Sequence, residues 1–122
     1  MTRKIPKIIQ NWADSIEQRN PKLMTKFYSR KAILLATYES MLLGRKQIRG
    51  YFDEFLDKKG LRCRIRENYT QIDRDRDTRI ASGIYEFTFV DENGRKQRVI
   101  ARYSYVINSG KIINHHSSVN PK

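Results

Sequence analysis

Three polar side chains in the last third of the chain have the types and positions needed for chemistry. Arg102 interrupts the apolar run 99–107, and His115 and His116 lie near the end of the run 111–119. Both runs predict β-strands, and the Asn-Ser-Gly sequence between them predicts a tight turn. A charged side chain buried in a strand needs a partner, since desolvating an unpaired charge is very costly. A buried guanidinium can hold an anion through two hydrogen bonds, as in a binding pocket, or can pair with an internal carboxylate.

The alternation of side chains along a strand limits which groups can share that pocket. Arg102 faces one side of its strand, whereas Tyr103 and Tyr105 face the other. His115 and His116 also point to opposite faces, so they cannot form a two-histidine metal clamp. We therefore expect no metal site and no cofactor.

Two carboxylates offer alternatives to a pocket that binds an anion. Arg102 could instead form a structural ion pair with Glu86 or Glu39. The same two acids are the candidates for general acid–base catalysis, with His115 and a tyrosine. The sequence contains no Ser-His-Asp set, Gly-rich phosphate loop or metal motif, so we assign no catalytic residues and lean against an enzyme.

Hydrophobic periodicity predicts helices first and strands later. Helical spacing covers residues 4–18, a short helix follows Asn20-Pro21, and a third helix follows Gly44. Predicted strands cover 32–37, 61–65, 80–90, 96–107 and 111–119. We expect one α+β domain over residues 1–122, with a cone-shaped curved antiparallel sheet wrapped around three N-terminal helices. A cavity between the third helix and the sheet is the expected ligand site.

The composition is strongly basic. Twenty-five Lys and Arg against thirteen Asp and Glu give a formal net charge of +12 over 122 residues. This charge would attract nucleic acid or an acidic protein, although basic residues are spread along the chain rather than gathered in a tail. The single cysteine, Cys63, cannot form an internal disulfide. No apolar run is long enough to insert into a membrane, and we expect a cytoplasmic protein.

Several motifs together resemble one known family. They are Trp12 in the first helix, the Gly-x-Tyr-x-Phe strand at 83–87, the Ala-Arg-Tyr-Ser-Tyr-Val strand at 101–106 and the closing His-His-Ser-Ser at 115–118. This order resembles the association domain of calcium/calmodulin-dependent protein kinase II, including its free-standing bacterial members. The resemblance implies the cystatin-like fold of the nuclear transport factor 2-like (SnoaL-like) superfamily. A kinase domain does not fit in 122 residues, so kinase activity is not implied.

The resemblance also implies assembly and a pocket. Members linked to kinases form dimers that build rings, and their pockets hold small carboxylates with arginines. Arg102 matches one of these arginines, Ser117 stands where a second would be, and the strand at Tyr85 offers no third.

We therefore expect a hub-like domain that associates with itself, as a homodimer or a higher ring, and binds a small anionic or polar ligand. The alternatives are an isomerase or lyase of the ketosteroid-isomerase type, and a cationic scaffold for nucleic acid or an acidic protein. The expected ligand-binding residues are Arg102, His115, Ser117, Tyr51, Tyr85 and Tyr38. The expected oligomer interface contains Tyr103, Tyr105 and His116, since an exposed aromatic sheet face would otherwise be a liability.

Overall fold

A computed structural model of the chain describes residues 1–39 and 41–119. Helices come first, as the periodicity predicts, and a long meander of strands follows. The elements are α1 (Lys7–Ser15), the 3-10 helix η1 (Ile16–Gln18), α2 (Pro21–Thr25), β1 (Tyr28–Leu35), β2 (Met41–Leu43), α3 (Gly44–Phe55), β3 (Lys59–Asp73), β4 (Thr78–Val90), β5 (Lys96–Asn108) and β6 (Lys111–Val119).

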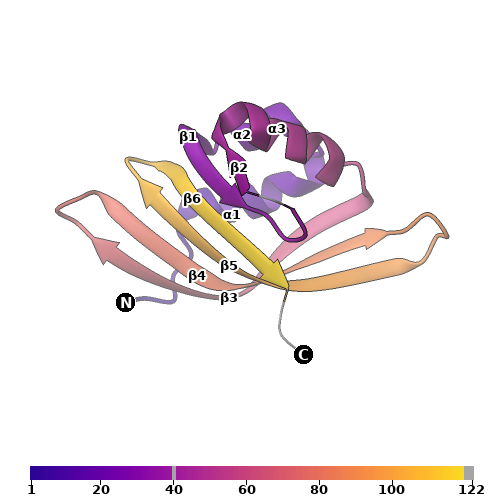
Figure 1. Cartoon of the computed structure of the whole chain (residues 1–122). Helices are drawn as coiled ribbons and strands as arrows, with labels where there is room; N and C mark the ends of the chain where they lie inside the picture. Colours follow the sequence, from indigo (N-terminus) through magenta and orange to yellow (C-terminus); the bar gives the residue numbers. More distant parts are fainter. Residues whose placement is uncertain (40, 120–122) are drawn as a thin grey trace.

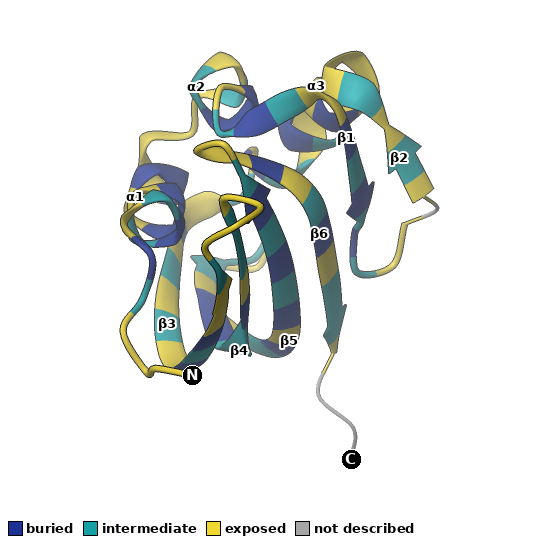
Figure 2. Cartoon of the chain, turned by 90° about the vertical axis from the view of Figure 1, so that its left-hand side faces the viewer, coloured by how far each residue is buried: buried dark blue, intermediate teal, exposed yellow. Residues whose placement is uncertain are grey.

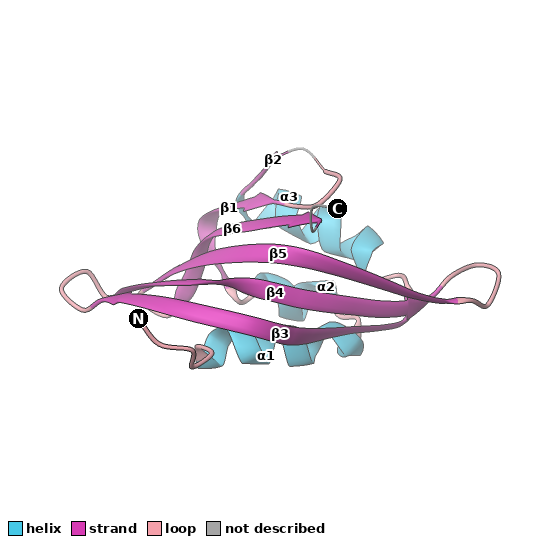
Figure 3. Cartoon of the chain, turned by 90° about the horizontal axis from the view of Figure 1, so that it is seen from below, coloured by secondary structure: helices cyan, strands magenta, loops and turns pink. Residues whose placement is uncertain are grey.

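The strands form one curved, open sheet in the order β2-β1-β6-β5-β4-β3. All neighbouring strands are antiparallel except β1 and β6, which are parallel. The helices lie within the concave side of the sheet (Figure 1). In the part of the chain that the structure describes, no helix covers the opposite side, which is seen from below in Figure 3. The predicted α+β architecture is confirmed, whereas the short strand β2 was not predicted because three residues are too few to show a period.

Each long strand of the meander has two different faces. We call the side toward the helices the inner face and the side away from them the outer face. Alternating exposure along β5 and β6 is visible as bands in Figure 2. The inner face carries Ala81, Gly83, Tyr85, Phe87, Ala101, Tyr103, Tyr105, His115 and Ser117. The outer face carries Ile80, Ser82, Ile84, Glu86, Ile100, Arg102, Ser104, Val106, His116 and Ser118.

The first helix closes the concave side because its apolar residues recur on one face. Ile9, Trp12 and Ile16 are fully or almost fully buried there. The chain then reverses at Arg19, which adopts a left-handed conformation, and the side chain of Asn20 accepts a hydrogen bond from the backbone N–H of Leu23 to begin α2. Trp12 is thereby held above the middle of the sheet.

A β-bulge bends the sheet where β3 crosses Gly83. The register between β3 and β4 shifts between Ile65 and Glu67. A Cβ atom at Gly83 would collide with the carbonyl oxygen of Glu67, so only glycine permits this approach. The Tyr103 hydroxyl donates a hydrogen bond of 2.7 Å to Oδ1 of Asn68, which fixes the bulge from the inner face. The close approach of the Glu67 carbonyl explains why the Gly-x-Tyr-x-Phe motif has a glycine at position 83.

Candidate functional site

A cavity of about 320 Å³ lies between α3 and the inner face of β4, β5 and β6. Its walls come from every layer of the fold, including Trp12 of α1 and the chain that follows β1. Most of its lining is aromatic or aliphatic: Trp12, Leu34, Ala36, Tyr51, Phe52, Phe55, Leu61, Tyr85, Phe87, Phe89, Val99 and Ala101. The expected cavity between the third helix and the sheet is therefore present.

Two periodic patterns make the walls aromatic. On β4, alternate residues Tyr85 and Phe87 point inward, with ring centroids 4.7 Å apart. On α3, Tyr51 and Phe55 lie one turn apart and stack at 5.3 Å, facing the sheet. The resulting walls favour a flat apolar ligand, because aromatic rings gain contact area when they pack on one another.

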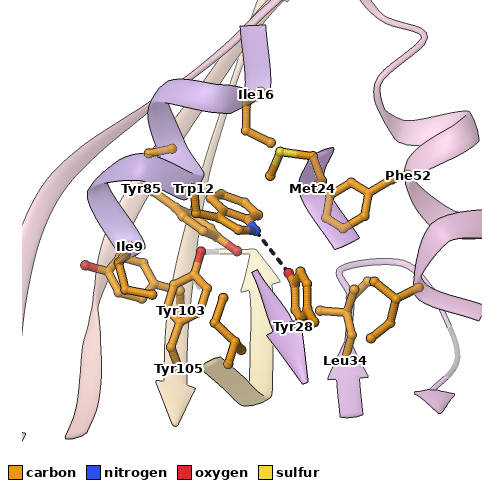
Figure 4. Close-up of a cluster of buried hydrophobic side chains, with 14 of the residues drawn as sticks. Ile9, Trp12, Ile16, Met24, Tyr28, Leu34, Phe52, Tyr85, Tyr103 and Tyr105 are labelled. Atoms are coloured by element: carbon orange, nitrogen blue, oxygen red, sulfur yellow. Dashed lines mark hydrogen bonds between the residues drawn. The ribbon is translucent and has the colours of Figure 1, made fainter. Parts of the chain in front are cut away.

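A chain of buried hydrogen bonds runs from the core to the cavity wall. The indole N–H of Trp12 donates to the hydroxyl of Tyr28 at 3.1 Å, as drawn in Figure 4. The Tyr28 oxygen also lies 2.8 Å from Nδ1 of His115. On the other side of the same ring, Nε2 of His115 lies 3.2 Å from the hydroxyl of Tyr85. His115 is only 2% exposed, and the ring of Tyr105 stacks on it at 4.0 Å.

This buried chain is electrically neutral. Burial lowers the pKa of His115 to about 3, with a smaller contribution from the charge of His116. Burial also raises the pKa of Tyr28 and of Tyr85 well above the usual value for tyrosine. The imidazole is therefore uncharged at neutral pH, and the two hydroxyls keep their protons.

The charged groups of the cavity lie at its mouth. Glu39, Glu54 and Lys58 contribute to the lining, but both glutamates are exposed. The ammonium of Lys58 lies 5.1 Å from the centre of the Phe55 ring, within the range of a cation–π contact. Among the described residues, no arginine lines the cavity. Solvent at the mouth screens these charges, so the interior offers no charged clamp.

Five of the six expected ligand-binding residues line the cavity together: Tyr38, Tyr51, Tyr85, His115 and Ser117. Tyr38 stands at the rim and is 84% exposed. The hydroxyls of Ser117 and Thr37 lie 2.9 Å apart in the wall, and Ser117 shares the face of His115, as the alternation predicts.

Arg102 requires a correction, because its side chain is exposed on the outer face and lies outside the cavity. Its Nε donates to Oγ of Ser118 at 3.3 Å. The predicted alternation is right, but the face toward the cavity was assigned the wrong way round. The reason is burial, since the inner face takes the two large tyrosine rings at 103 and 105, for which the outer face has no covering layer.

The same reversal corrects two further expectations. Tyr103 and Tyr105 are buried against the helices rather than exposed for an interface, whereas His116 is exposed on the outer face. Glu86 also lies on the outer face, and it pairs with Arg66 and Arg98, each at 3.0 Å, rather than with Arg102. Its carboxylate is therefore not available for acid–base chemistry in the cavity.

Sequence reasoning missed the part played by Trp12. Its helical position predicts burial, but its indole N–H also needs an acceptor once buried, and the hydroxyl of Tyr28 supplies that acceptor. The sequence indicates that a buried Trp12 needs a hydrogen-bond acceptor, but it does not indicate that Tyr28 is that acceptor.

Residues 1–39 and 41–119 contain neither a metal cluster nor a membrane-spanning helix. Nowhere in that part of the chain do three His, Cys, Asp or Glu side chains gather closely enough to hold a metal ion. No helix there has the length and apolar character needed to cross a lipid bilayer.

Comparison with known proteins places this chain in a family. The sequence model of one protein family, the calcium/calmodulin dependent protein kinase II association domain, matches residues 1–121. The chain belongs to this family. A solved Xanthomonas campestris structure given the same domain name superposes with a TM-score of 0.86 and 30% identity, covering 100% of this chain and 96% of that one.

More distant structures share the fold alone. An NTF2-like protein with a cystatin-like fold from Novosphingobium aromaticivorans has a TM-score of 0.77 at 9% identity, covering 93% of this chain and 77% of that one. A hypothetical protein with a ketosteroid isomerase-like fold from Catenulispora acidiphila, in complex with trimethylamine, has a TM-score of 0.76 at 14% identity, with 93% and 85% covered. A search of curated proteins found no significant match.

Proposed function

We propose that this association domain assembles with itself and binds a small, uncharged, largely apolar molecule in the cavity between α3 and the inner face. The single observation that carries the ligand proposal is the aromatic cavity whose buried polar groups, Tyr85 and His115, are neutral and hydrogen-bonded. An anionic ligand loses its support, because Arg102 faces away from the cavity. A largely apolar pocket with a few convergent polar groups is the usual form of a small-molecule site.

The outer face supports the assembly proposal. Among the described residues, no helix covers this side of the sheet (Figure 3). Its side chains mix aliphatic residues such as Ile84 and Ile100 with small polar ones. Ser82 and Ser104 lie 3.0 Å apart across two of its strands, so part of its polar surface is already satisfied within the sheet. An uncovered face of this kind can pack against its own copy about a two-fold axis.

Light scattering tests the assembly. Ile80 lies on the outer face and is 37% exposed, so Ile80→Arg places a charge in the proposed interface. We expect the measured mass to fall from that of a dimer or ring toward that of one chain. Leu43→Arg is the control, because Leu43 is 51% exposed but lies on β2, at the far edge of the sheet. A wild-type protein that is a single chain at high concentration would contradict the assembly.

Calorimetric titration with indane, an apolar two-ring probe, tests the cavity. We expect binding to the wild type and loss of binding in Val99→Phe, which fills part of the cavity wall. Val106→Phe is the matched control, because Val106 lies on the outer face of the same strand. The fluorescence of Trp12, the only tryptophan, reports occupancy of the cavity independently. Indane that does not bind, or binds all three proteins equally, contradicts the site.

A further inference from the structure

The buried hydrogen-bond chain of Trp12, Tyr28, His115 and Tyr85 has a direction. An indole nitrogen can only donate a hydrogen bond, whereas a hydroxyl can both donate and accept. Trp12 therefore donates to the oxygen of Tyr28. The proton of Tyr28 then needs an acceptor of its own, and Nδ1 of His115 at 2.8 Å is the partner that the structure places there.

The direction continues through the imidazole. A neutral histidine carries a proton on one ring nitrogen only. Because Nδ1 accepts from Tyr28, the proton lies on Nε2, which donates to the oxygen of Tyr85 at 3.2 Å. The hydroxyl proton of Tyr85 is then not used by these four residues. Tyr85 lies in the cavity wall, where Ser117 is the other polar side chain near enough to hydrogen-bond its hydroxyl.

The opposite direction is less stable. If Nδ1 carried the proton and donated to Tyr28, the Tyr28 oxygen would accept twice and its own proton would have no acceptor among the contacts of this fully buried residue. A buried donor without a partner is destabilising. The indole N–H of Trp12, at one end of the hydrogen-bond chain, therefore determines that the Tyr85 hydroxyl at the other end accepts from His115 and keeps its own proton to donate.

We propose that the Tyr85 hydroxyl donates its proton into the cavity, so that the ligand is an uncharged molecule with a hydrogen-bond acceptor, such as a ketone or ether oxygen, on a flat apolar body. This inference rests on the proposed function, since it names the ligand class of the same site. The flat body follows from the rings beside that hydroxyl, where Trp12 stacks on Tyr85 with centroids 5.9 Å apart and an interplanar angle of 15°.

The tautomer of His115 tests the direction without any ligand. Nitrogen NMR of histidine-labelled protein separates a protonated ring nitrogen from an unprotonated one. We expect Nε2 of His115 to carry the proton at neutral pH, and His116→Gln allows the signals to be assigned. A proton on Nδ1 would overturn the proposal, whatever the cavity binds.

Two matched probes test the ligand class. Indane and 1-indanone have nearly the same shape, but only 1-indanone carries an acceptor. We expect 1-indanone to bind the wild type roughly threefold to tenfold more tightly than indane, the usual gain from one hydrogen bond. Tyr85→Phe should remove this preference, so that the variant binds 1-indanone no more tightly than indane.

The outcomes separate the two proposals. Indane that does not bind removes the proposed small-molecule function and the ligand class with it. Indane that binds as well as 1-indanone leaves the cavity as a binding site but overturns the acceptor-bearing ligand.

Discussion

The two faces of strand β5 differ sharply in burial and polarity. Tyr103 and Tyr105 on the inner face are almost completely buried, while the alternating residues Arg102 and Ser104 lie on the outer face. On the inner face, His115 is held by neutral hydrogen bonds. On the outer face, the side chain of Arg102 is exposed and the buried carboxylate of Glu86 pairs with two arginines. The comparison teaches that a shift of one residue along a strand separates a candidate binding site from a candidate assembly surface.

Gly83→Ala should break this arrangement most severely. The new methyl group would collide with the Glu67 carbonyl and crowd the Tyr103 hydroxyl. The bulge and the hydrogen bond from Tyr103 to Asn68 must therefore both shift. We expect a loss of about 3 kcal/mol or more in the free energy of unfolding, measured with urea. A loss below about 1 kcal/mol would show that the bulge relaxes without affecting the fold.

The protonation of His115 should make the inner face sensitive to acid. The pKa of His115 is lowered to about 3 in the folded protein, against about 6.5 in the unfolded chain. Between these values the unfolded chain binds the extra proton, so the free energy of unfolding falls as the pH falls. From neutral pH to about pH 5 we expect His115 to contribute a loss of about 2 kcal/mol.

Denaturation at several pH values checks this contribution. His115→Gln should flatten that part of the pH dependence, whereas His116→Gln on the outer face should keep it. Equal pH profiles for the wild type and His115→Gln would contradict a buried neutral imidazole.

Two tyrosines that contact the same imidazole should respond differently when they lose a hydroxyl. Tyr28→Phe removes the partner of Trp12 and of His115, and we expect a loss of about 1–3 kcal/mol in the free energy of unfolding. The Tyr105 hydroxyl is buried without a hydrogen-bond partner, so Tyr105→Phe should be neutral or slightly stabilising. A larger loss for Tyr105→Phe than for Tyr28→Phe, in urea denaturation, would show that the hydrogen-bond chain is not what stabilises this layer.

Arg102→Ala should have the smallest effect. Its side chain is exposed and makes one 3.3 Å hydrogen bond to Ser118, so the free energy of unfolding should change by less than about 0.5 kcal/mol. Affinity for 1-indanone should not change either. A tenfold loss of affinity for 1-indanone would show that Arg102 belongs to the binding site.

Much of the fold could be predicted because its patterns are local. Helical spacing around Trp12, the Asn20-Pro21 start of α2 and the alternation in β4 each depend on neighbours in the sequence. Strand β2 could not be predicted, since its three residues pair with β1 through the tertiary structure.

The site could be predicted only in part. Alternation showed that Arg102 and Tyr103 face apart, but the side that the helices cover is a property of the whole sheet. Arg102 was expected to be buried, but its side chain is exposed to solvent, and the rings of Tyr103 and Tyr105 are buried instead. Trp12 and Tyr28 meet across layers, and no pattern within either segment specifies that contact.

A crystal structure of the protein soaked with 1-indanone would test the account most directly. We predict that the ketone lies in the cavity with its oxygen within hydrogen-bond distance of the Tyr85 hydroxyl, against the rings of the inner face. An empty cavity, or a ketone bound beside Arg102 on the outer face, would contradict the assignment of the inner face as the binding face.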